Sequence, residues 1–157
     1  MTGITILLVA LVAVVAVGLF LKSRSGTVRA SAAAPPNSTQ GRTELLVAAG
    51  VQSTGGPVVL HFSADWCGPC AAVRRVVDQV VTSMADMPRP PTDVELDIDK
   101  HPALAREMSV LSLPTTFILD GNLVEKFRVP GVPSTTDLRN ALMPFSTPDD
   151  PNSSITG

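Results

Sequence analysis

The chain has 157 residues, of which 45% are hydrophobic, 17% are charged and 4% are aromatic. This length fits one domain with short extensions, and the apolar fraction excludes a wholly disordered protein. A formal net charge of −2 gives no general reason to bind nucleic acid, and two cysteines are too few for a small protein held by several disulfides.

The N-terminal part is strongly apolar: residues 4–21 form a run of 18 residues without a charged side chain. A helix that crosses ~30 Å of hydrocarbon needs about 20 residues, with a lower limit of about 17. We therefore expect a single transmembrane helix within residues 1–22. A cleaved signal peptide is the alternative, because residues 30–34 are small. Such peptides usually have positive charge before a shorter apolar core, whereas residues 1–3 carry none.

Three basic residues, Lys22, Arg24 and Arg29, follow this run closely. Basic residues beside a membrane span tend to stay in the cytoplasm. We therefore expect a single-pass protein of the cell membrane with its globular part on the cytoplasmic side; the extracytoplasmic orientation is the alternative. From residue 30 onward the chain has 14 acidic and 9 basic residues, so this part is mildly acidic.

The next segments predict a tether, a helix and a strand. Residues 23–38 are rich in Ser, Ala, Pro and Gly, which is typical of a flexible tether, with a short edge strand conceivable at residues 27–30. Residues 43–51 predict a short helix. Residues 58–63 (VVLHFS) form a continuous β-prone run, typical of a central strand that is buried on both faces.

Helices and strands then alternate. Residues 67–85 predict a helix, because apolar side chains recur at steps of three, four and one, and the Pro-rich residues 87–91 end it. Residues 93–99 alternate apolar and acidic side chains, which predicts a strand with one polar face. A short helix at residues 102–108 and a strand at residues 115–119 follow.

The C-terminal part predicts a hairpin and a last helix. Residues 120–122 (DGN) indicate a tight turn, because Asp-Gly accepts a positive φ, so residues 123–129 should return antiparallel. Ser134 is the predicted N-cap of a helix that ends near residue 143. Residues 146–157 are polar and Pro-rich, which predicts a disordered tail.

The order β-α-β-α-β-β-α predicts an α/β domain with a central mixed sheet flanked by helices on both faces, built from two parallel crossovers and a hairpin. The expected organisation is an anchor (1–22), a tether (23–38), this domain (39–145) and a tail (146–157). A domain of this length can bury its own core.

Both cysteines lie in the motif W-C-G-P-C at residues 66–70. At a turn from a strand into a helix, the thiols of Cys67 and Cys70 can close a small disulfide ring. The free N–H groups and the dipole of the helix N-terminus favour an anion, so we expect Cys67 to be the exposed thiolate and Cys70 the shielded thiol. Gly68 permits the tight entry, and Pro69 has no N–H to lose in the first turn. Cys67 would attack a substrate disulfide, and Cys70 would release the product.

Half a zinc site and a structural disulfide are the alternatives for this pair. Structural zinc usually takes four protein ligands, and the chain offers only His61 and His101 in addition, with no second C-x-x-C. A four-residue ring gains little loop entropy, which disfavours a purely structural disulfide. We therefore expect neither a metal nor a cofactor.

The W-C-G-P-C motif after an apolar strand resembles the active-site signature of the thioredoxin family. The likeness extends through S-L-P-T at residues 112–115, Gly121 in the hairpin and Gly131 before the last helix, and it covers about residues 39–145. It implies the thioredoxin fold, and it implies that Pro114 is the cis proline beside the active site. An ordinary turn proline is the alternative, since only ~5% of X–Pro bonds in folded proteins are cis.

The resemblance also implies a substrate-binding groove around Cys67. Trp66 then forms an apolar wall of this groove, although a core position is the alternative. The backbone groups of Leu113 and Thr115 are offered to an extended substrate, with Pro114 packed near Cys67. The further substrate-binding residues of this expectation are Gly68, Pro69 and Gly131.

The chain departs from the family pattern beside the motif. His61 stands where thioredoxins usually carry a buried Asp, and Glu95 stands where a Lys typically pairs with that Asp. Imidazole exchanges protons near neutral pH, so His61 could take the proton of Cys70 through a water. The alternative is a structural His61 hydrogen-bonded to Glu95. Ala71 stands where the family often places a Lys. Arg74 and Arg75 are interpreted as a solvated helix face, and compensation for this missing Lys is the alternative.

Together these features predict a membrane-tethered thiol–disulfide oxidoreductase that reduces protein disulfides, with membrane contact through residues 4–21 and no nucleic-acid partner. An external electron donor, such as a thioredoxin reductase or a membrane thiol carrier, would restore the dithiol. The alternatives are an extracytoplasmic thiol oxidase or isomerase and a non-enzymatic docking subunit with the same fold.

Overall fold

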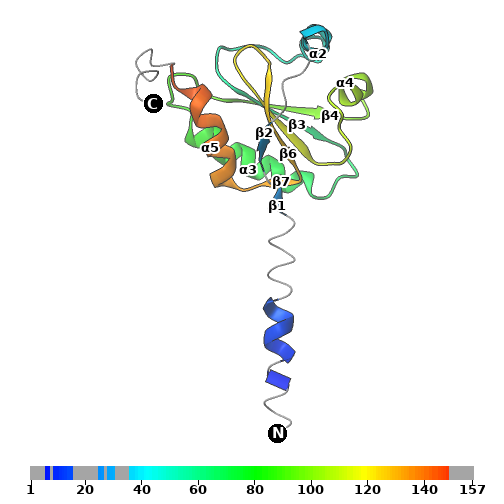
Figure 1. Cartoon of the computed structure of the whole chain (residues 1–157), viewed down its shortest axis with the longest axis vertical. Helices are drawn as coiled ribbons and strands as arrows, with labels where there is room; N and C mark the ends of the chain where they lie inside the picture. Colours follow the sequence, from blue (N-terminus) through cyan, green and yellow to red (C-terminus); the bar gives the residue numbers. More distant parts are fainter. Residues whose placement is uncertain (1–5, 8, 16–24, 27, 31–35, 149–157) are drawn as a thin grey trace.

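The computed structural model describes residues 6–7, 9–15, 25–26, 28–30 and 36–148 (Figure 1). The described part contains a five-stranded sheet in the order β2-β6-β5-β3-β4, and β1 pairs with β7 in a two-stranded sheet. In chain order the elements are β1 (Ser25–Gly26), β2 (Arg29–Ala30), α2 (Pro36–Ala48), β3 (Val58–Ser63), α3 (Cys70–Ser83), β4 (Thr92–Asp97), α4 (Pro102–Glu107), β5 (Thr115–Leu119), β6 (Glu125–Pro130), β7 (Val132–Pro133) and α5 (Thr135–Ser146).

The sheet separates two apolar layers. Figure 1 shows α2 and α4 on one side of the sheet and α3 and α5 on the other. The layer under α2 and α4 contains Leu60 and Phe62 of the sheet, and the layer under α3 and α5 contains Val59 and Ile118. The expectation of a mixed sheet with helices on both faces is therefore confirmed.

Strand β3 is the centre of this arrangement. It lies between β4, to which it is parallel, and β5, to which it is antiparallel, and all six of its residues are buried. Because successive side chains of a strand point to opposite faces, Val59 and His61 share the face covered by α3, while Leu60 and Phe62 point to α2 and α4. The prediction of a central strand at residues 58–63 is confirmed.

The connection from β4 to β5 differs from the expected second parallel crossover. β5 is antiparallel to β3, and its first residue, Thr115, lies opposite Phe62. Asp97, the last residue of β4, lies opposite Ser63, so the chain enters β5 at the same end of the sheet at which β4 finishes. The six residues of α4 do not carry the chain back across the sheet, and β3-α3-β4 is the parallel crossover of the described part.

Element boundaries also differ from the sequence-based expectation. α2 begins at Pro36, earlier than the expected start at residue 43, because proline suits the first helical turn. α3 begins at Cys70 instead of Cys67, because the intervening residues form a turn in which the Cys70 N–H donates to the Cys67 carbonyl at 3.2 Å. The conceivable strand near residues 27–30 is present as β2, which pairs with β6 at the sheet edge.

Residues 6–7 and 9–15 are helical, and their large apolar side chains are exposed. Within the described ranges, no helix combines the length and the apolar character that a membrane crossing requires. The other residues of the expected anchor, part of the expected tether (23–38) and residues 149–157 of the expected tail lie outside the described residues.

Ser134 caps α5, as the sequence predicted: the Asp137 N–H donates to the Ser134 hydroxyl at 3.1 Å, and this hydroxyl donates to the Asp137 carboxylate at 2.7 Å.

Ser134→Ala removes this acceptor and should lower the free energy of unfolding by about 1 kcal/mol, measured by urea denaturation. Thr136→Ala, at an exposed position in the same turn, is the control and should change it by less than about 0.5 kcal/mol. An equal loss in both variants would contradict the capping role.

Candidate active site

Cys67 and Cys70 lie between the end of β3 and the first turn of α3, and they form a disulfide. Cys67 is 9% exposed and Cys70 is 1% exposed. The Cys67 N–H donates to the Ala64 carbonyl at 3.0 Å, which fixes the loop after β3. Cys67 is therefore the more accessible of the two residues, but it is largely covered in this disulfide form, whereas the sequence predicted an exposed Cys67.

A second segment, distant in sequence, lies against this disulfide. Leu113 packs on the small cluster formed by the two cysteines and Ala64, and the Leu113–Pro114 peptide bond is cis. The Gly131 N–H donates to the Pro114 carbonyl at 2.8 Å. Gly131 has a φ of 85°, in the left-handed region that favours glycine, so a side chain at this position would strain the loop that supports Pro114.

The remaining residues of the predicted substrate site lie in these same two segments. Gly68 and Pro69 are exposed in the turn before α3. Thr115 is the first residue of β5, and its buried hydroxyl donates to the Ser112 carbonyl at 2.7 Å. The fold thus brings the W-C-G-P-C loop and the loop before β5 together at one end of β3.

The exposed apolar surface of this region includes one residue that sequence reasoning missed. Trp66 is 71% exposed, which excludes the core position that was its alternative, and its indole Nε1 donates to the Asp99 carboxylate at 3.3 Å. Leu111, two residues before Leu113, is 94% exposed. A leucine between Val110 and Ser112, just before the predicted cis proline, was the available signal, but its exposure depends on the tertiary structure.

His61 is 1% exposed, and its partner differs from the expectation. Its Nε2 lies 3.1 Å from the Asp93 carboxylate, not against Glu95. Glu95 is the residue in register with His61 on β4, and Asp93 is two residues earlier on the same strand face. The interpretation that pairs His61 with Glu95 is wrong, because Glu95 is bound by a side chain of α3.

That side chain is Arg74, whose Nε donates to both carboxylate oxygens of Glu95 at 2.8 and 2.9 Å. Arg74 is thus an ion-pair partner of β4 rather than part of a purely solvated helix face. Its hydrogen bond lowers the pKa of Glu95 from 4.5 to about 2, against the opposing effect of burial, with help from a hydrogen bond to Ser63 and from His61. The same hydrogen bond raises the pKa of Arg74.

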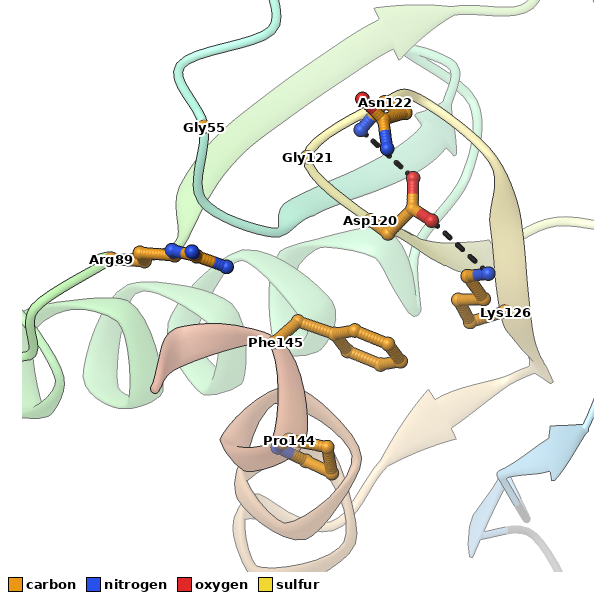
Figure 2. Close-up of a pocket in the computed structure, with 8 residues that line it drawn as sticks. All are labelled: Gly55, Arg89, Asp120, Gly121, Asn122, Lys126, Pro144 and Phe145. Carbon is orange, nitrogen blue, oxygen red and sulfur yellow. Dashed lines mark hydrogen bonds and ion pairs between the residues drawn. The ribbon is translucent and has the colours of Figure 1, made fainter. Parts of the chain in front are cut away.

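Two further properties of the described residues concern possible ligands. They contain no group of three or more His, Cys, Asp or Glu side chains placed to hold a metal ion. A cavity of about 470 Å³ lies between the β5–β6 hairpin and the end of α5 (Figure 2). In this view the Lys126 ammonium faces Asp120, with which it forms an ion pair of 3.1 Å, and none of the predicted site residues lines the cavity.

The Arg74–Glu95 pair predicts a pH dependence of stability. A carboxylate with a lower pKa in the folded state stabilises the fold above its unfolded pKa, and this contribution is lost as the pH falls through the folded pKa. The free energy of unfolding should therefore decrease between pH 4.5 and about 2, and Arg74→Gln should make this decrease shallower. Urea denaturation across this pH range measures it. Arg75→Gln, at the exposed neighbouring position, should keep the wild-type slope, and identical slopes in all three proteins would contradict the assignment.

Comparisons with known proteins match this architecture. The sequence model of the thioredoxin family matches residues 47–143. The thioredoxin of Mycobacterium tuberculosis is 37% identical over 86 residues, which cover 54% of this chain and 71% of that protein. The bifunctional thioredoxin reductase/thioredoxin of Mycobacterium leprae is 37% identical over 73 residues, but these cover 46% of this chain and 15% of that protein.

A solved structure with the same fold is also similar to this chain. Thioredoxin-2, described as a component of malaria parasite protein secretion machinery, has a TM-score of 0.51 and 29% sequence identity, with 57% of this chain and 82% of that chain covered. The range matched by the family model includes the disulfide loop, the cis Pro114 and Gly131. The chain therefore belongs to the thioredoxin family, and it is a thioredoxin-like disulfide oxidoreductase.

Proposed function

We propose that the protein is a membrane-tethered reductase of protein disulfides, which acts by dithiol–disulfide exchange through Cys67 and Cys70. The observation that carries this function is the disulfide between two cysteines of unequal exposure, beside the cis Pro114 and the exposed Trp66. A more accessible cysteine and a fully covered one suit a sequential exchange, in which the first attacks the substrate and the second releases it.

In the reduced protein, the Cys67 thiolate attacks one sulfur of a substrate disulfide, and the other substrate sulfur leaves as a thiolate that takes a proton from water. Cys70 then gives up its proton and attacks the Cys67 sulfur of the mixed disulfide, which expels the second substrate thiolate. His61, buried on the sheet face under α3, is the acceptor that we propose for the Cys70 proton. Two electrons pass to the substrate, and the protein is left with its Cys67–Cys70 disulfide.

The reducing direction requires an external electron donor. The Gly-Pro pair between the cysteines resembles that of the reducing members of the family, and this supports the reductase over the oxidase or isomerase alternative. A relative of this chain is named as a bifunctional thioredoxin reductase/thioredoxin, which supports a thioredoxin reductase as the donor. A membrane thiol carrier is the second donor that a tethered domain could use.

The substrate contacts follow from the exposed residues around the disulfide. Trp66 and Leu111 present two large apolar side chains to solvent, and Leu113, two residues after Leu111, packs on the disulfide. Exposed aromatic and aliphatic side chains beside a reactive group are typical of contact surfaces. We infer a substrate segment that is extended along Leu113 and Thr115 and carries apolar residues near its disulfide.

The membrane tether rests on the apolar run at residues 4–21 and on the exposure of its described side chains, from 53% at Val15 to 70% at Val14. Exposed side chains of this kind favour an apolar environment over water. Lys22, Arg24 and Arg29 support an orientation with the thioredoxin domain on the cytoplasmic side.

Cys70→Ser should trap substrates, because the variant lacks the sulfur that resolves the mixed disulfide on Cys67. We expect high-mass adducts on non-reducing gels that disappear on reduction. Cys67→Ser is the control: it should form no adducts and should not accelerate the reduction of insulin disulfides by dithiothreitol. If Cys67→Ser accelerated insulin reduction as well as the unaltered protein, the reductase function would be wrong and a docking role would remain.

The tether predicts that the full chain sediments with membranes and resists extraction with alkaline carbonate. Removal of residues 1–22 should transfer the domain to the soluble fraction. For orientation, Thr147→Cys in a chain that lacks both native cysteines places one thiol at an exposed position. A maleimide that cannot cross membranes should label it only after lysis, and labelling in intact cells would overturn the cytoplasmic orientation.

A further inference from the structure

The face of β3 that is covered by α3 and α5 contains an unusual pair of buried polar side chains. His61 of β3 and Thr116 of β5 are in register on neighbouring strands, and they are 1% and 0% exposed. Side chains directly opposite one another on antiparallel strands have Cβ atoms about 5 Å apart. Each of the two carries a buried polar atom, Nδ1 of His61 and Oγ1 of Thr116, that has no hydrogen-bond partner among the described residues.

The hydrogen bond made by Nε2 of His61 determines whether Nδ1 can accept a proton. Nε2 lies 3.1 Å from the Asp93 carboxylate, and a carboxylate can only accept a hydrogen bond. Nε2 is therefore the donor of this hydrogen bond, and in the tautomer with its proton on Nε2 the buried Nδ1 keeps its lone pair. The hydrogen bond from Nε2 to Asp93 thus leaves Nδ1 as the nitrogen of His61 that can accept a proton.

The thiol that must lose a proton lies over this same face. Cys70 begins the buried side of α3, followed by Val73 and Val77. In the β3-α3-β4 crossover the helix runs back over the sheet, so its first turn covers the end of β3 where His61 lies. Of the other charged groups near His61, Glu95 of β4 is bound by Arg74 of α3, which leaves Asp93 as the carboxylate paired with the imidazole.

We propose that Thr116 and Asp93 complete a proton path from Cys70 to solvent: a water held by the Thr116 hydroxyl and His61 Nδ1 takes the Cys70 proton to the imidazole, and Asp93 receives the Nε2 proton. Buried polar atoms without protein partners are commonly satisfied by ordered water, and these two belong to side chains that are in register on neighbouring strands. Asp93 has a side chain that is 37% exposed, so it can pass the proton to bulk water. Thr116 is then a positioning residue and Asp93 the outlet. This path rests on the proposed function.

The step balances without a further reagent. The S–H bond of Cys70 breaks, and its proton becomes the Nδ1 proton of His61 through the water. The resulting thiolate forms the bond to Cys67, the bond between Cys67 and the substrate breaks, and the electron pair leaves with the substrate sulfur. The Nε2 proton then moves to Asp93 and to solvent, and the ring keeps the proton on Nδ1. When the electron donor reduces the disulfide again, the Nδ1 proton returns through the water to the Cys70 thiolate, and Nε2 takes up a proton from solvent through Asp93, which restores the starting ring.

An aromatic disulfide that releases a coloured thiolate, such as dithiobis-nitrobenzoate, separates the two chemical steps. The reduced full chain should release one equivalent when Cys67 attacks and a second when Cys70 resolves, and Cys70→Ser should release only the first. Asp93→Asn should slow the second release on the order of tenfold and change its pH profile near neutrality, with the first release unaltered. Asp78→Asn, on the exposed side of α3, is the matched control and should change neither.

Thr116→Val tests the positioning role, because it replaces the hydroxyl by a methyl group of similar shape. We expect a several-fold slower second release that Thr116→Ser restores. If Thr116→Val and Asp93→Asn, folded as judged by their melting temperatures, both kept the wild-type second release at every pH, the proton path would be wrong while the reductase stood. Absence of the first release in the unaltered chain would instead overturn the reductase function itself.

Discussion

Burial of β3 on both faces is the constraint on which the rest of the molecule depends. Six consecutive buried residues fix β3 in the middle of the sheet, between a parallel and an antiparallel neighbour, and each face is covered by a pair of helices. Because β3 ends at Ser63, the loop that carries Cys67 begins there, and its cysteines form a small cluster that is separate from the two main apolar layers. The same constraint forces His61 inside, where a polar ring is stable only with a hydrogen-bond partner.

The two acidic side chains on the polar face of β4 have different partners. Asp93 and Glu95 point to the same side of the strand, toward α3, but Glu95 is bound by Arg74 near the surface and Asp93 by the buried His61. The first pair is largely exposed and contributes modestly to stability in water. In the second pair, Asp93 accepts a hydrogen bond from His61 and so offsets the free-energy cost of burying the imidazole beneath α3. One carboxylate bound by Arg74 and one bound by the buried His61 thus stand where the Asp–Lys pair is usual in the family.

The candidate active site is assembled from segments that are distant in sequence. The disulfide loop follows β3, Leu113 and Pro114 precede β5, and Gly131 supports Pro114 from the end of β6. All three segments reach the same end of the sheet because β5 and β6 run antiparallel to each other and β5 runs antiparallel to β3. This explains how Leu113, distant in sequence from the cysteines, comes to pack on the disulfide.

The sequence by itself determined the features that depend on neighbouring residues: the buried β-prone run of β3, the amphipathic pattern of α3, the Ser134 cap and the cysteine spacing. Motif resemblance added Pro114 and Gly131. Only the tertiary structure decided the direction of β5, the early start of α2, the exposure of Leu111 and the partner of His61. The reason is physical: strand direction and side-chain pairing depend on which segments share a face of the sheet, and two acidic residues on one strand are equivalent until Arg74 and His61 are placed beside them.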